Sequence, residues 1–145
     1  LHTNDAPTAI NRLVDMGIPN FLLASSIRGV IAQRLVRKLC PNCKKEIEVP
    51  ESVAKEAGIE PHTKVYAPCG CAACRFTGYS GRTVIAELMM MDSTLRDMIN
   101  DSAPDHEIRS YARKNGMSTL RESAMRKVLA GVTSIEEMLC STMID

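Results

Sequence analysis

Apolar residues recur along the chain in short periodic runs, most of which begin or end at a recognisable cap or turn residue. Near the N-terminus, Ile10, Leu13 and Val14 repeat at the spacing of one helix face. Asp5 before this run is a favourable N-cap, and Gly17 after it is a favourable stop. The pattern predicts an amphipathic helix in this stretch.

The pattern over residues 29–39 is compatible with a helix or a strand. Ile31, Leu35 and Leu39 are four residues apart, which suits one face of a helix, but they also share one face of a strand. A glycine at the start of the segment and several β-branched residues within it favour the strand. We therefore expect a strand here.

Between residues 40 and 74 the pattern loosens into a small insert, and the C-terminal third carries a series of helix signals. Thr119 with Glu122, and Thr133 with Glu136, have the spacing of capping boxes, which start helices. The other expected elements are short helices at 19–28 and 51–57, strands at 63–67 and 82–92, and helices that begin near residues 92 and 104.

Composition indicates a mixed or helix-rich globular chain. The 145 residues are 45% hydrophobic but include only two Phe, three Tyr and no Trp, so the core must come from aliphatic residues and Met. The net charge of +1 lacks the basic excess expected of a nucleic-acid binder.

One segment is nevertheless strongly basic. The stretch from Asn20 to Lys45, here called the basic segment, has six basic residues and no acidic one, which indicates a solvated face or a site for phosphate or an acidic partner. The longest apolar run, FLLASSI, is too short to cross a bilayer.

The cysteines carry the most specific signal. CPNC, from Cys40 to Cys43, and CAAC, from Cys71 to Cys74, are two CxxC pairs with 27 residues between them. A CxxC turn brings two sulfurs to one side, so two such turns supply the four thiolates of a tetrahedral zinc site. Because four thiolates leave no open coordination position, we expect a structural Zn²⁺ rather than a catalytic one.

The remaining two cysteines are not expected to bind the metal. One residue separates Cys69 from Cys71, which makes a poor chelating turn, so Cys69 is interpreted as a bystander. Cys140, near the end of an expected helix, is predicted to be a buried small apolar residue. A disulfide framework and a redox CxxC remain as weaker alternatives, because the sequence shows neither a small loop-rich secreted fold nor a thioredoxin-like βαβ unit.

Four segments together resemble one protein family. LHTNDAPTAINRLVDMG, IAQRLVRKLCPNC, GCAACRFTGYSGRTVIAEL and LAGVTSIEEML occur in this order and cover essentially the whole chain. They are similar to the C-terminal part of hexameric ATPases of the traffic ATPase superfamily, namely the type II secretion ATPases and the pilus-extension ATPases of type IV pili. The resemblance also implies that the tetracysteine insert separates this group from the related pilus-retraction ATPases.

The resemblance implies an α/β fold, namely the C-terminal remnant of a RecA-like ATPase domain with a small zinc-binding insert and a helical C-terminal segment. Residues 1–39 would end the RecA-like domain, residues 40–75 would form the tetracysteine insert, and residues 76–145 would form a strand and a helical subdomain. The chain begins without an initiator Met, so it is interpreted as a piece of a longer polypeptide.

The resemblance implies ATP hydrolysis only for the longer polypeptide of which this chain would be a part, here called the parent. LHTND looks like the histidine box of the family, which implies an auxiliary catalytic role for His2 near the γ-phosphate. AQRL matches a second family signature, but it implies no defined role for Gln33 or Arg34. No GxxxxGK[ST] segment occurs, so the fragment alone is not expected to hydrolyse ATP, and ATP and Mg²⁺ are expected only in the parent.

The implied parent is a homo-hexamer in the cytoplasm, peripheral to the inner membrane. It would act on an inner-membrane platform protein to power type II secretion or type IV pilus assembly, and the motifs do not distinguish these two roles. No nucleic-acid partner is expected. An alternative function is a zinc-ribbon module that binds nucleic acid or protein through the basic segment, although the scarcity of aromatic residues disfavours base stacking. A thiol redox protein is a third hypothesis.

Overall fold

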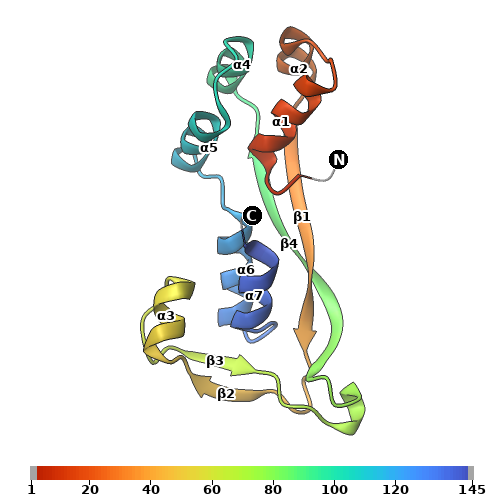
Figure 1. Cartoon of the computed structure of the whole chain (residues 1–145), viewed down its shortest axis with the longest axis vertical. Helices are drawn as coiled ribbons and strands as arrows, with labels where there is room; N and C mark the ends of the chain where they lie inside the picture. Colours follow the sequence, from red (N-terminus) through yellow and green to blue (C-terminus); the bar gives the residue numbers. More distant parts are fainter. Residues whose placement is uncertain (1–2, 144–145) are drawn as a thin grey trace. The chain divides into compact units, whose positions relative to one another are not determined.

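The computed structural model describes residues 3–143, which form two compact units (Figure 1). Unit 1 contains the described residues up to Gln33 together with Ala86–Leu120, and unit 2 contains Arg34–Ile85 together with the described residues from Arg121. Each unit is thus built from two separate stretches of chain. The described residues form seven α-helices and two two-stranded sheets, which confirms the expected mixed α/β class.

Unit 1 contains four helices that pack in pairs. α1 (Ala6–Asp15) packs against α5 (Asp105–Lys114), and α2 (Asn20–Ser26) packs against α4 (Ser93–Asn100). All four helices begin within a few residues of the positions that the sequence pattern predicts.

Side-chain caps and a shared apolar core hold these helices in place. The Asp5 carboxylate accepts a hydrogen bond from the backbone N–H of Thr8 at 2.9 Å, which confirms the predicted cap of α1. Asp92 caps α4 in the same way, through the N–H of Leu95 at 2.8 Å. The largest fully buried side chains in the core of this unit are Ile10, Met89, Leu95 and Ile108.

A buried carboxylate on β4 (Tyr79–Met90) joins the starts of two helices. Glu87 is only 4% exposed, and its two oxygens accept hydrogen bonds from the backbone N–H of Ala6 at 2.8 Å and of Leu120 at 3.3 Å. Ala6 is the first residue of α1, and Leu120 is the first residue of α6 (Leu120–Leu129). The negative charge therefore lies at two helix N-termini, where the helix dipoles favour it.

A long two-stranded sheet contributes residues to both units. β1 (Gly29–Leu39) pairs with β4, which confirms the strand expected there. The backbone N–H of Met91 donates to the carbonyl of Arg28 at 3.1 Å, and that of Cys40 donates to Gly78 at 2.9 Å. Since the beginning of one strand lies beside the end of the other, the two strands are antiparallel.

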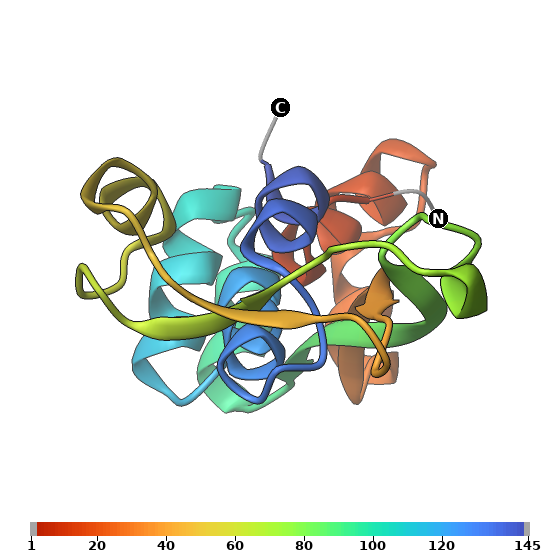
Figure 2. The same ribbon diagram turned by 90° about the horizontal axis from the view of Figure 1, so that it is seen from below.

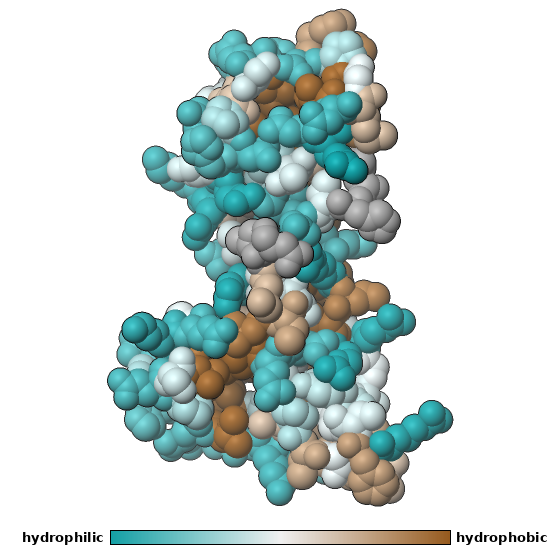
Figure 3. All heavy atoms as spheres, in the orientation of Figure 1, coloured by the Kyte–Doolittle hydropathy of each residue, from teal (hydrophilic) through white to brown (hydrophobic). Residues whose placement is uncertain are grey.

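Unit 2 contains a second, shorter sheet. β2 (Lys45–Glu48) pairs antiparallel with β3 (Lys64–Ala67), and α3 (Glu51–Ala57) connects them. The helix and β3 confirm the prediction, whereas β2 was not predicted. Seen from below in Figure 2, the sheet formed by β2 and β3 lies across α6 and α7 (Ile135–Thr142). Figure 3 shows apolar surface between α3 and α7. The largest fully buried apolar side chains of this unit are Val36, Val49, Ile85, Val128 and Met138.

The start of α7 differs by one residue from the predicted capping box. Ser134, rather than Thr133, is the N-cap, and its hydroxyl accepts a hydrogen bond from the backbone N–H of Glu137 at 3.2 Å. Thr133 is fully buried and its hydroxyl donates to the carbonyl of Arg37 on β1 at 2.7 Å. The Thr133–Glu136 prediction is wrong because a tertiary acceptor holds the threonine hydroxyl.

The loop between α6 and α7 contacts the second sheet closely at Gly131. Its φ of +73° is left-handed, and a Cβ atom there would lie 2.9 Å from a ring carbon of Tyr66. Lys44 Nζ donates to the Gly131 carbonyl at 2.9 Å and lies 4.5 Å from the centroid of the same ring. Both the backbone conformation and the close contact therefore require glycine.

Replacement of Glu87 by alanine is expected to lower the free energy of unfolding by about 2–4 kcal/mol, because two buried N–H groups lose their acceptor. Urea denaturation of the metal-loaded chain measures the change. Glu60→Ala is the matched control, since Glu60 is exposed, and it should alter stability by less than about 0.5 kcal/mol. Equal stability of the two variants would contradict the assigned role of Glu87.

Replacement of Gly131 by alanine is expected to destabilise unit 2 by about 2 kcal/mol or more, through the left-handed backbone and the contact with Tyr66. Gly58→Ala is a matched control, because Gly58 has a similar φ of +74° and nothing within 4 Å of an added Cβ. Thermal unfolding of both variants isolates the contribution of the contact. If Gly58→Ala lowered the thermal stability as much as Gly131→Ala, the contact with Tyr66 would make no contribution to the destabilisation.

Candidate metal centre

The two CxxC segments meet where β1 ends and β4 begins. Cys40 directly follows β1, and Cys43 lies in the turn before β2. Cys71 precedes a short 3₁₀ helix that ends at Cys74. The backbone hydrogen bond from Cys40 to the carbonyl of Gly78 holds the two segments beside each other.

The four sulfur atoms have the spacing of a tetrahedral thiolate site. All four lie within 4.8 Å of one another. Sγ of Cys71 is 3.9 Å from that of Cys40 and 3.8 Å from that of Cys74, and Cys43 and Cys74 are 3.8 Å apart. A Zn–S bond of about 2.3 Å in a tetrahedron places sulfurs roughly 3.8 Å apart, so these three distances match those expected around a zinc ion.

Backbone N–H groups point at the sulfurs and favour negative charge on them. Gly70 donates to Sγ of Cys43 at 3.2 Å, whereas Cys71 and Gly78 donate to Sγ of Cys74 at 3.2 and 3.3 Å. The bond from the Cys71 N–H, aided by that from Gly78, lowers the pKa of the Cys74 thiol to about 6 against the effect of burial. The Gly70 N–H lowers the pKa of Cys43, but burial and the adjacent thiols outweigh it and raise that pKa to about 11.

The opposite shifts have one physical cause. The site favours one thiolate, and each further negative charge among closely spaced sulfurs is disfavoured unless a cation balances it. A divalent metal supplies that balance, because coordinated thiols are deprotonated. Gly70 and Gly78 are therefore part of the site although the sequence analysis did not select them. The signal was their position beside the cysteines, but N–H orientation is visible only in the fold.

The structure agrees with the interpretation of Cys69 but not with that of Cys140. Cys69 is exposed and lies outside the group of four clustered sulfurs, in agreement with its interpretation as a bystander. Cys140 is exposed on α7, so the prediction that it is buried is wrong. Its position on the helix faces away from Met138, which is fully buried.

Part of the basic segment holds unit 2 together. Arg37 makes a hydrogen-bonded ion pair with Glu137 at 2.9 Å and lies 4.1 Å from the centroid of the Tyr79 ring. Burial raises the pKa of Glu137, but the hydrogen bonds from Arg37 outweigh burial and lower it overall. Arg34 donates to the carbonyl of Ser141 at 2.9 Å, in the last turn of α7, where a cation is favourable.

Among the described residues, Gln33 and Arg34 are not brought into a site with the cysteines. His2 lies outside the described residues. Gln33 is exposed on β1, and the structure assigns it no contact that defines a role. Arg34, whose role the sequence left open, instead stabilises the end of α7.

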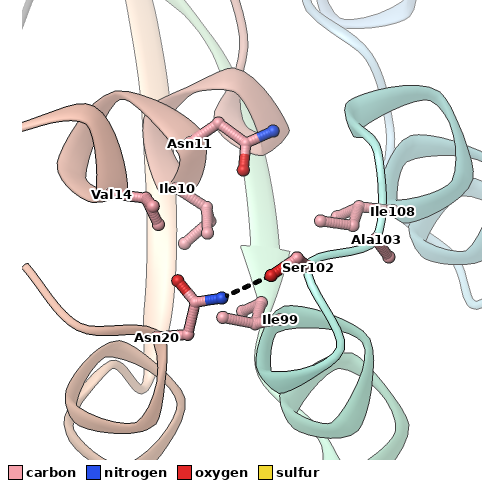
Figure 4. Close-up of a pocket in the computed structure, with 8 residues that line it drawn as sticks. All are labelled: Ile10, Asn11, Val14, Asn20, Ile99, Ser102, Ala103 and Ile108. Atoms are coloured by element: carbon pink, nitrogen blue, oxygen red, sulfur yellow. Dashed lines mark hydrogen bonds between the residues drawn. The ribbon is translucent and has the colours of Figure 1, made fainter.

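A pocket in unit 1 is too small to be a nucleotide site (Figure 4). Its volume is about 40 Å³, enough for one or two water molecules and far below the roughly 300–1,000 Å³ of small-molecule sites. Asn20 Nδ2 donates to the hydroxyl of Ser102 at 2.9 Å at its edge. The other lining residues are Ile10, Asn11, Val14, Ile99, Ala103 and Ile108.

No helix among the described residues is long and apolar enough to span a membrane.

Comparison with known proteins agrees with the motif resemblance. The chain is 43% identical over 143 residues to a type IV pilus assembly ATPase of Acinetobacter baylyi, an alignment that covers 96% of this chain and 24% of that protein. It is 46% identical over 141 residues to type II secretion system protein E of Pseudomonas aeruginosa, covering 96% and 28% of the two chains. It is 41% identical over 150 residues to a type IV pilus assembly ATPase of Myxococcus xanthus, covering 100% and 26%.

The chain therefore spans about a quarter of the length of these curated relatives. The model of the family described as type II/IV secretion system protein matches residues 1–140. The resemblance to type II secretion and type IV pilus ATPases is thus confirmed, and the chain belongs to the type II/IV secretion system protein family.

Proposed function

We propose that this chain is the C-terminal part of a hexameric ATPase that powers type II protein secretion or type IV pilus assembly, and that its four clustered cysteines hold a structural zinc ion. Family membership supports the first part, together with relatives that are named as pilus assembly ATPases and as a secretion system protein. The clustering of four sulfurs within 4.8 Å of one another, with three pairs at 3.8–3.9 Å, is the observation that carries the second part.

In this proposal the chain contributes structure rather than phosphate chemistry. The sequence has no GxxxxGK[ST] segment, so ATP and Mg²⁺ would be bound by parts of the longer parent. Residues 1–39 would be the end of its RecA-like domain, residues 40–75 the zinc insert, and residues 76–145 a strand with a helical subdomain. His2 would assist at the γ-phosphate. The parent would be a cytoplasmic homo-hexamer at the inner membrane, acting on a platform protein.

Zinc would act here as a structural cross-link. Cys40, Cys43, Cys71 and Cys74 would be its ligands, and the N–H groups of Gly70, Cys71 and Gly78 would stabilise their negative charge. Four thiolates saturate a tetrahedral ion, so no position is left for a water nucleophile. When bound, the ion supplies folding free energy to the insert, on the order of 10 kcal/mol.

The zinc-ribbon alternative, a module that binds nucleic acid or protein through basic residues, is less well supported. Arg34, Arg37 and Lys44 all bond to carbonyl or carboxylate groups within unit 2. The charge of Arg37 is therefore partly neutralised by Glu137, and the other two side chains already hold a carbonyl before any phosphate approaches. Absence of a salt-dependent gel shift with labelled DNA or RNA would exclude the nucleic-acid version.

Metal analysis of the purified chain is expected to find one zinc per chain. Serine substitution of any one of Cys40, Cys43, Cys71 and Cys74 should abolish tight binding, because three thiolates no longer close the tetrahedron. Cys69→Ser is the matched control and should retain the metal. Retention by Cys71→Ser together with loss in Cys69→Ser would show that the ligand set is wrong.

The same samples test the redox hypothesis. A zinc site predicts that a chelator, but not a thiol reductant, reduces the ellipticity and thermal stability of the chain. A reversible disulfide between Cys71 and Cys74, with no metal at any stage of purification, would instead favour a thiol redox protein.

The motor function can be tested by exchange of the matching segment. A chimera of the Acinetobacter baylyi pilus assembly ATPase, with its corresponding quarter replaced by this chain, is expected to hydrolyse ATP. Cys40→Ser with Cys43→Ser in that chimera should reduce hydrolysis by about tenfold or more, through loss of zinc-dependent folding. Cys69→Ser is again the control. A folded, zinc-containing chimera without hydrolysis would contradict the proposed function but leave the zinc site intact.

A further inference from the structure

The turn after the second CxxC pair displays an aromatic side chain on a strained backbone. Phe76 is 77% exposed. Arg75 and Phe76 both adopt left-handed conformations, with φ of +55° and +61°. For bulky residues this conformation is sparsely populated and clusters at functional positions.

The metal segment holds this turn rigidly. The backbone N–H of Phe76 donates to the carbonyl of Cys71 at 2.8 Å, and that of Arg75 donates to Ala72 at 3.2 Å. Among the described residues, no carboxylate lies within ion-pair distance of the Arg75 guanidinium. The turn therefore presents an aromatic ring and an unpaired cation, and both Phe and Arg are enriched at protein interfaces. We refer to Arg75 and Phe76 as the tip.

Unit 2 also carries an apolar groove between α3, the second sheet and α7. Its volume is about 280 Å³, and Figure 3 shows the apolar surface there. A cavity of about 150 Å³ is sufficient to bind benzene, so the groove has room for a phenylalanine ring. The groove is lined by Ile47, Val49, Pro50, Val53, Glu56, Val65, Tyr66, Ala67, Pro68, Ser134, Ile135, Glu136 and Leu139.

The charged residues of the groove are both acidic. Glu56 and Glu136 are exposed, and among the described residues no basic side chain pairs with either carboxylate. An apolar groove with two unpaired carboxylates favours an occupant that combines an apolar group with a positive charge. The tip has this combination.

Figures 1 and 2 place the turn that carries the tip and helix α3 at opposite ends of unit 2, so a chain does not fill its own groove. We propose that Phe76 of one copy inserts into the groove of a second copy, with Arg75 beside Glu56 and Glu136. Tip and groove are different surfaces, so the contact is heterologous and each copy can bind two others. The copies form a closed ring when the rotation between neighbouring copies divides a full turn.

This inference goes beyond the proposed function, because it names a subunit contact that zinc binding and ATP hydrolysis do not require. A contact made by one aromatic anchor and two ion pairs is below the standard interface size. We therefore expect a dissociation constant on the order of 100 µM for the isolated chain. The effective concentration within a larger assembly would strengthen it.

Sedimentation equilibrium of the zinc-loaded chain over a concentration series tests the contact. Wild type should self-associate, and Phe76→Ala should weaken association by at least about tenfold. Phe21→Ala is the matched control, because Phe21 is a similarly exposed aromatic at 65% but lies in unit 1. Zinc content and thermal unfolding confirm that each variant remains folded.

A charge exchange provides the second test. Arg75→Glu in one chain, and Glu56→Lys with Glu136→Lys in another, should each prevent self-association. A mixture of the two should associate, because each tip then meets a groove of opposite charge. The proposal is overturned if wild type stays monomeric, if Phe76→Ala associates like wild type, or if the mixture remains monomeric. Any of these results with one zinc per chain leaves the metal centre unaffected.

Discussion

The convergence of four thiols is the constraint on which the middle of the chain depends. Residues 40–78 contain two strands of four residues, a helix of seven and loops, so they bury little apolar surface of their own. The antiparallel pairing of β1 with β4 brings Cys40 beside Gly78, and the two CxxC turns then face each other. Backbone N–H groups favour negative charge on the sulfurs. A divalent cation bound there would stabilise the folded insert, because the unfolded chain has no such site.

Cations next to the cysteines connect this region with the last two helices. Lys44 reaches the carbonyl of Gly131, Arg37 pairs with Glu137, and Arg34 binds the end of α7. The run of basic residues without acidic neighbours thus has a structural use, since its partners are supplied from residues about a hundred positions later. A short stretch of sequence shows the basic residues, but it does not show which distant carbonyl or carboxylate groups accept their hydrogen bonds.

These features suit a rigid projecting element better than a reactive one. The sulfurs are closely spaced, and the turn that follows them is held by backbone hydrogen bonds to the same segment. Such an element can present side chains to a neighbour at low entropic cost, because the backbone is already ordered before contact. The proposed roles in folding and in subunit contact are compatible but independent, since one uses the sulfurs and the other uses side chains on the outer surface.

The sequence by itself determined most of the local structure. Helix α1 with its Asp5 cap, helix α3, strand β1 and the two CxxC pairs were all predicted, because their causes lie within a few neighbouring residues. The family was also evident from four short segments. What failed was decided by partners distant in the chain. Thr133 bonds to Arg37 instead of capping α7, and Cys140 is exposed although it was predicted to be buried.

Only the tertiary structure decided the parts of the site that depend on distance. It showed that the four sulfurs lie within 4.8 Å of one another, that Gly70 and Gly78 direct N–H groups at them, and that Glu87 joins two helix starts. Hydrogen bonds and coordination depend on angstrom-scale positions of groups far apart in the chain, and periodicity carries no such information. The residue types for a metal centre were therefore present in the sequence, whereas its geometry came from the pairing of β1 with β4.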